Sequence, residues 1–107
     1  MNLDAEDQKL VTLARGACAR VSSTAGACVR DQDGRTYSAA AVTLGSNSYD
    51  ALELAVITAL MNGAKTLEAG CIFGSSPSAD DVAKFRLCAQ PSALLIAVAS
   101  DGTMVSV

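Results

Sequence analysis

Segments with strand and helix character alternate along this chain, and only short turns separate them. Residues 66–73 and 93–99 are apolar runs of strand length, and the second contains no polar residue. Residues 78–89 lie between them and open with Ser78-Ala79-Asp80-Asp81, a string that suits the first turn of a helix. A strand–helix–strand unit places its two strands parallel in one sheet. Since fully apolar strands are buried on both faces, we expect helices on both sides of this sheet.

The segments before this unit extend the same pattern. Apolar residues recur at helical spacing from Asp4 to about Val21. Strands are predicted at 26–30 and 35–43, joined by a tight hairpin at Asp33-Gly34. A helix over 49–62 is predicted to begin after a polar string that offers N-cap side chains.

The helix at 49–62 is apolar on nearly every side, which is typical of a helix in a protein interior. A last strand, 103–107, follows a turn at Asp101-Gly102. The sequence therefore predicts a single domain over residues 1–107, in the order α-β-β-α-β-α-β-β. The fold class is a three-layer α/β/α sandwich around a mixed five-stranded sheet.

Composition excludes several classes of function. The formal net charge is −3 and the 8 basic residues are scattered singly, so no nucleic-acid partner is expected. The longest apolar run falls far short of the ~20 residues that a membrane-spanning helix needs. The chain contains no histidine, which rules out Ser-His and Cys-His dyads and histidine-ligated metals. The acidic N-terminal residues show no hydrophobic signal segment, so we expect a cytoplasmic protein with four reduced, packed cysteines.

Several local strings, with this element order, resemble the zinc-dependent cytidine deaminases over about residues 10–107. They are Gly26-Ala27 entering a strand, Asp33-Gly34-Arg35 at the hairpin, Ser48-Tyr49 before the central helix, and Pro77 before the next helix. In that family a Cys-Ala-Glu triplet follows the tyrosine by five residues, and Pro-Cys-x-x-Cys opens the next helix. The matching positions here are Leu54-Ala55-Val56 and Pro77 to Asp81.

The resemblance implies a deaminase site whose chemical groups are missing. The family's zinc needs one ligand from the central helix and two cysteines from the next, and a glutamate moves the proton of the zinc-bound water. The vestigial positions are Leu54 and Val56 for the first ligand and the glutamate, and Ser78 and Asp81 for the two cysteines. The family's substrate-reading Asn-x-Glu falls on Ala41-Val42-Thr43, across an insertion. We therefore expect no zinc, no other cofactor and no cytidine deaminase activity.

Two loops carry a weaker signal. Serine and asparagine side chains precede the two helices and are expected to converge near the old pocket as possible ligand contacts; they are Ser46, Asn47, Ser48, Ser75 and Ser76. Helix N-termini attract anions, but Asp50, Asp80 and Asp81 oppose an anion there. We expect Leu54 and Val56 to fill the old metal site, and Glu53 to reach the surface or a subunit interface.

Three functions follow from this interpretation. The first is a non-catalytic structural or protein-interaction module, a homo-oligomer (dimer or tetramer) with an unknown protein partner, as the family's own dimers and tetramers imply. The second is a binding domain for a nucleoside-like small molecule in a vestigial pocket. The third is an enzyme with an unrelated, rebuilt site, for which the sequence offers no nucleophile–base pair.

Overall fold

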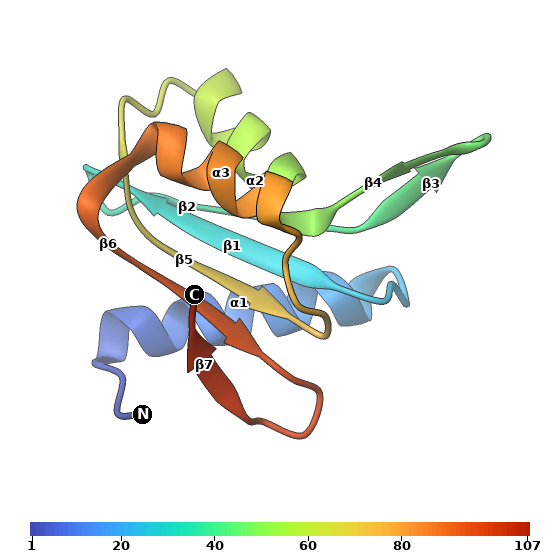
Figure 1. The fold of residues 1–107 in the computed structure, drawn as a ribbon, viewed down its shortest axis with the longest axis horizontal. Coiled ribbons are helices and arrows are strands. Elements are labelled where there is room, and N and C mark those ends of the chain that lie inside the picture. Colours follow the sequence, from blue (N-terminus) through green and yellow to red (C-terminus); the bar gives the residue numbers. More distant parts are fainter.

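The computed structural model describes all residues, 1–107, and contains three helices and seven strands (Figure 1). In chain order they are α1 (Ala5–Arg20), β1 (Gly26–Asp31), β2 (Thr36–Ala40), β3 (Val42–Leu44), β4 (Asn47–Tyr49), α2 (Ala51–Met61), β5 (Leu67–Phe73), α3 (Ala79–Cys88), β6 (Ala89–Val98) and β7 (Met104–Ser106). No helix combines the length and the apolar character needed to cross a membrane.

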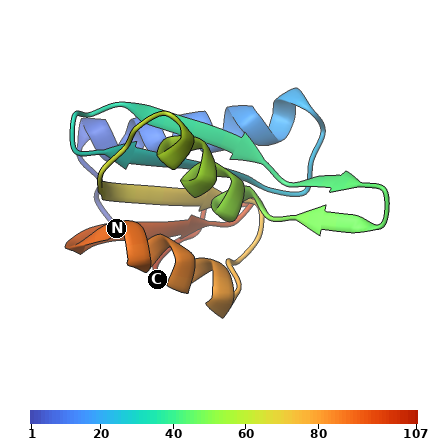
Figure 2. The same ribbon diagram turned by 90° about the horizontal axis from the view of Figure 1, so that it is seen from above.

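Five strands form one mixed sheet in the order β2-β1-β5-β6-β7. β5 and β6 are parallel, whereas β1 is antiparallel to both of its neighbours and β7 is antiparallel to β6. Helix α1 covers one face of the sheet, and α2 and α3 cover the other (Figures 1 and 2). The predicted three-layer fold with a mixed five-stranded sheet is confirmed.

Alternation along the strands divides the core into two layers. On β1, Val29 faces α2 and α3, while Cys28 faces α1. Two glycines allow the layers to approach closely. A Cβ on Gly26 would collide with the backbone oxygen of Ala14 in α1, and one on Gly70 would lie 2.7 Å from the ring of the fully buried Phe85.

The predicted strand 35–43 is too long, because the chain leaves the sheet after Ala40. Residues 42–44 and 47–49 instead pair as a separate antiparallel hairpin, β3–β4, which projects from the body of the molecule (Figures 1 and 2). Gly45 adopts a φ of 63° in its turn, a conformation that glycine accepts without strain. The polar string expected to cap the next helix thus forms this turn and strand β4.

Helix α2 begins two residues later than predicted, after the N-cap Asp50. Only one side of it is interior: Leu52, Val56 and the alanines on the same side are buried. Ile57, Leu60 and Met61 are 46%, 48% and 78% exposed. The expectation of a wholly interior helix is wrong, since a helix laid on one face of a sheet always turns its outer side away from that sheet.

Candidate functional site

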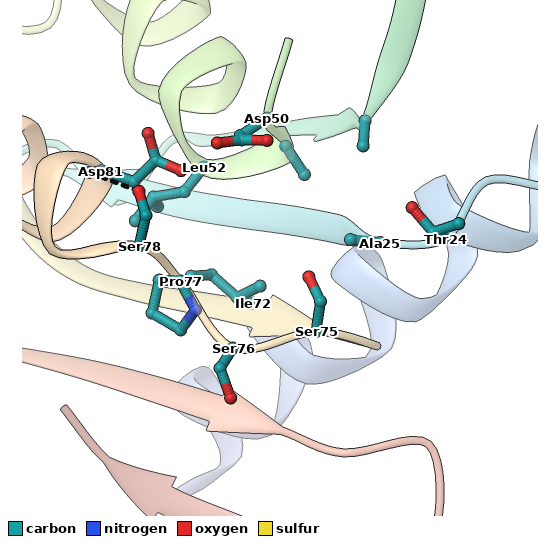
Figure 3. A pocket seen from close by; sticks show the side chains of 12 residues that line it. Thr24, Ala25, Asp50, Leu52, Ile72, Ser75, Ser76, Pro77, Ser78 and Asp81 are labelled. Carbon is teal, nitrogen blue, oxygen red and sulfur yellow. Dashed lines mark hydrogen bonds between the residues drawn. The ribbon is translucent and has the colours of Figure 1, made fainter. Parts of the chain in front are cut away.

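A pocket of about 300 Å³ lies where the N-termini of α2 and α3 meet the loop that follows β5 (Figure 3). Its polar lining consists of four hydroxyl side chains and two carboxyl groups, from Thr24, Ser75, Ser76, Ser78, Asp50 and Asp81. Its apolar lining comes from Ala25, Ala41, Ala51, Leu52, Ile72 and Pro77. The volume is at the lower end of the range for small-ligand pockets.

Local sequence places the polar groups at the two helix starts. Ser78 is the N-cap of α3, and its Oγ accepts a hydrogen bond of 3.1 Å from the backbone N–H of Asp81, as the sequence predicts. At α2, Glu53 Oε1 accepts a hydrogen bond of 2.9 Å from the backbone N–H of Asp50. Each helix thereby brings one aspartate to the pocket.

Asp50 and Asp81 face each other across the junction of the two helices (Figure 3). Ligand oxygens of Asp50, Glu53 and Asp81 lie within 4.8 Å of one another, and Asp81 is only 4% exposed. Burial, hydrogen bonding to the Asp50 carboxyl and the charge of that carboxyl raise the pKa of Asp81 to about 6, and the Ser78 hydroxyl lowers it in part.

Lys84, a cation on the adjacent turn of α3, is paired with carboxylates other than Asp50 and Asp81. Lys84 Nζ lies 2.9 Å from Glu53 Oε2 and 3.1 Å from Asp80 Oδ2. The Lys84 ion pair lowers the pKa of Glu53, and the bond from the backbone of Asp50 acts in the same direction. Glu53 thus forms an ion pair within the chain. No lysine or arginine nitrogen lies within 4.0 Å of the carboxylate of Asp50 or Asp81.

A family model described as "Cytidine deaminase-like" matches residues 3–102. The chain belongs to the cytidine deaminase-like family. Solved structures of cytidine deaminases share its fold, at low sequence identity. The enzyme from Burkholderia pseudomallei has a TM-score of 0.77 and 17% identity, over 92% of this chain and 91% of that chain. The Mycobacterium tuberculosis enzyme has a TM-score of 0.75 and 20% identity, over 86% and 85% of the two chains. For the Mycobacterium leprae enzyme the TM-score is 0.72 and the identity 17%, over 96% and 94%. A search of curated proteins found no match.

The structure brings together only some of the positions singled out in the sequence. Ser75, Ser76, Ser78 and Asp81 line the pocket. Ser48 lines a neighbouring cavity at the base of the β3–β4 hairpin. Ser46 and Asn47 lie in the hairpin itself and line neither cavity, because this segment forms a β-turn and strand rather than a helix cap.

Leu54 and Val56 do not line the pocket either. They lie one turn further along α2, where Val56 is 4% exposed in the core. The start of α2 lines the pocket with the N-cap Asp50, Ala51 and Leu52, and Asp50 and Leu52 lie four residues before Leu54 and Val56. An alanine separates each of these two pairs, so the Cys-Ala-Glu pattern fits both registers. The Asp-x-x-Glu capping string marks where the helix begins and is the sequence signal for Asp50 at the pocket, whereas the spacing from Ser48-Tyr49 places the family's triplet at Leu54-Ala55-Val56.

The groups at this pocket do not suit the zinc ion of a cytidine deaminase-like site. A catalytic zinc is held by three protein ligands, most often imidazole and thiolate. The pocket offers four hydroxyls and two carboxyl groups, while both oxygens of Glu53 are taken by Lys84 and the backbone of Asp50. Cys28 and Cys71 are fully buried opposite each other on β1 and β5, and burial raises the pKa of their thiols to about 11 and about 12.

Proposed function

We propose that this chain is a non-catalytic member of the cytidine deaminase-like family that acts as a protein-interaction module. The observation that carries the proposal is the set of groups at the pocket. Deamination in this fold uses a metal-activated water and a carboxylate that moves its proton. The pocket has no thiolate or imidazole, and apolar Leu52 stands two residues after Asp50 where α2 enters it. This reasoning holds in either register of α2, because Leu54 and Val56 also lack the required groups.

An exposed apolar surface supports the interaction role. Four large side chains on the outer side of α2 and α3 form what we name the α2–α3 patch: Ile57, Leu60, Met61 and Leu87, which are between 46% and 86% exposed. Ile57, Leu60 and Leu87 also line a shallow cavity of about 190 Å³, which Glu53 and Lys84 border. An apolar centre with a polar rim is the composition of a protein interface. We propose that this patch joins copies of the chain into a homo-oligomer.

A second candidate function is the binding of a nucleoside-like ligand without chemistry. The open pocket of about 300 Å³ at the starts of α2 and α3 favours it. Cytidine and uridine titrations followed by calorimetry test this candidate. Saturable binding that Ser75→Arg, at an exposed position of the pocket lining, abolishes would support it over the interaction module.

The metal content of the purified protein tests the non-catalytic proposal. We expect elemental analysis after native purification to give far less than one zinc per chain, because the pocket lacks the nitrogen and sulfur ligands that zinc prefers. About one zinc per chain that survives dialysis against a chelator would overturn the proposal.

A further inference from the structure

The Asp50–Asp81 pocket is the middle of a longer groove. It shares Ser75 and Ser76 with a cavity of about 350 Å³ beside β6 and β7. On its other side it shares Thr24, Ala41 and Asp50 with a cavity of about 480 Å³ at the base of the β3–β4 hairpin. Because neighbouring cavities have lining residues in common, we treat the three as one groove, and Figure 3 shows its central part.

The charge of this groove is confined to its centre. Asp50 and Asp81 are the only charged residues that line any of the three cavities. The remaining polar side chains are hydroxyls, such as Ser48 and Thr43 on one flank and Thr103 on the other. Uncharged hydroxyls donate and accept hydrogen bonds equally well, so they suit the N–H and C=O groups of a peptide backbone.

The central carboxyl pair lacks a counter-charge. Asp81 is only 4% exposed, and its side-chain partners are the Ser78 hydroxyl and the Asp50 carboxyl. Lys84, the cation of the adjacent helix turn, is paired with Glu53 and Asp80 instead. Two close carboxyl groups with no cation are unfavourable when both are ionised. A positive group entering the pocket would remove that penalty.

We propose that the groove binds an extended segment of a partner protein and that one lysine or arginine side chain of this segment inserts between Asp50 and Asp81. This inference rests on the proposed interaction function and names its partner. Lysine and arginine carry their charge on a slender stem, which suits a pocket with a partly apolar wall. The flanking cavities give the chain room to continue on both sides, which a free amine would leave unused.

Amide chemical shifts of the intact ¹⁵N-labelled protein test the proposal. The probe is acetyl-Ser-Gly-Ser-Arg-Ser-Gly-Ser-amide, with norleucine in place of arginine as its uncharged counterpart and N-propylguanidinium as the free cation of the same charge. We expect the arginine peptide to shift Asp50, Ser75 and Asp81, and to bind at least about tenfold more tightly than the norleucine peptide or propylguanidinium.

Three variants make the test specific. Asp81→Asn should weaken binding of the arginine peptide at least about tenfold. Ser75→Arg, at an exposed position of the pocket lining, should abolish binding by placing a cation of the chain itself there. Asp80→Asn is the matched control, since it removes the same charge from the neighbouring exposed residue outside the groove, and it should bind like wild type.

Other outcomes would overturn the inference. An equal loss of peptide binding in Asp80→Asn and Asp81→Asn would show that only the overall charge of the protein attracts the peptide. Propylguanidinium binding as tightly as the peptide would assign the pocket to a free small cation. Equal binding of the norleucine peptide would show that the positive charge does not contribute. None of these results bears on zinc content, so failure here is distinguishable from failure of the proposed function.

Discussion

Asp31 and Asp81 are the two buried charged residues of the chain, and their surroundings differ sharply. Burial raises the pKa of Asp31, but hydrogen bonds from the Tyr37 hydroxyl and the backbone N–H groups of Asp33 and Arg35 outweigh it and hold that pKa below its usual value. Asp81 has only the Ser78 hydroxyl as such a donor, and a second carboxyl group lies beside it. Asp31 therefore stabilises the β1–β2 hairpin, whereas the ionised carboxylate of Asp81 is unfavourable in its place at the pocket.

Replacing Asp81 should make the protein more stable at neutral pH. Because burial and the neighbouring carboxyl raise the folded-state pKa of Asp81 to about 6, the folded protein holds an extra proton between about pH 4 and pH 6. The stability that this proton contributes is present at low pH and is lost as pH rises through about 6. We expect Asp81→Asn to gain about 1–2 kcal/mol in unfolding free energy at pH 7.5, with the gain shrinking toward pH 4.

Urea unfolding followed by circular dichroism across this pH range measures the gain. Asp33→Asn is the control, since Asn-Gly supports a tight hairpin as well as Asp-Gly does, and it should show no such trend. A destabilised Asp81→Asn variant at pH 7.5, or a difference independent of pH, would contradict the assigned environment of Asp81.

The stability cost of polar substitutions in α2 should show which of its positions lie in the core and which face an open pocket. Val56 is 4% exposed in the α2 core layer, so Val56→Glu buries a carboxyl group without a partner and should cost at least about 2 kcal/mol. Leu54 is only partly buried, so Leu54→Cys should cost about 1 kcal/mol. Val42, 45% exposed on β3, takes the same Val→Glu change as a control and should change stability by less than about 0.5 kcal/mol.

Thermal melts with and without zinc rank these variants, and zinc should rescue none of them. If the Val56→Glu variant has the same melting temperature as the Val42→Glu variant, position 56 faces an open, hydrated space. The candidate site would then have to be moved one turn along α2.

Among the elements, the regular ones were predictable and the irregular segment was not. The Asp-Gly hairpin, the Ser78 cap and the continuous apolar run in β6 appear where local patterns place them. The β3–β4 hairpin was missed because its three-residue strands pack on nothing else, and its Ser-Asn-Ser string suits a helix cap as well as a turn. That error also placed the start of α2 two residues too early.

The α2–α3 patch should hold copies of the chain together. Its large apolar side chains gain free energy when they leave water, so we expect light scattering after size exclusion to give a mass above that of one chain. Leu60→Glu and Leu87→Glu each place a charge in the contact and should give monomers. Leu13→Glu, at a 37% exposed leucine of α1 on the opposite face, should keep the wild-type mass. A wild-type monomer at tens of micromolar, or equal loss in all three variants, would refute the patch as an interface.

On the scale of the whole molecule, the order of the layers follows from the order of helices and strands along the chain. The site depends in addition on the exact residues at which two helices begin. Strand polarity and helix placement need only the sequence of elements and the handedness of crossovers. The Asp50–Asp81 pair needs two helix starts, far apart in sequence, to be placed to within one residue. The Asp-x-x-Glu string marks the start at Asp50, but Ser46, Asn47 and Ser48 are competing cap residues just before it.

Turnover of cytidine tests the central claim most directly. The absence of a zinc-binding set of thiolates and imidazoles, and of a proton-carrying glutamate beside it, predicts no hydrolysis. The assay follows the ultraviolet change of cytidine and deoxycytidine with the zinc-supplemented protein, and a known cytidine deaminase serves as the positive control. We predict a rate equal to that of the buffer. A rate that scales with protein concentration and co-purifies with the chain would contradict the account.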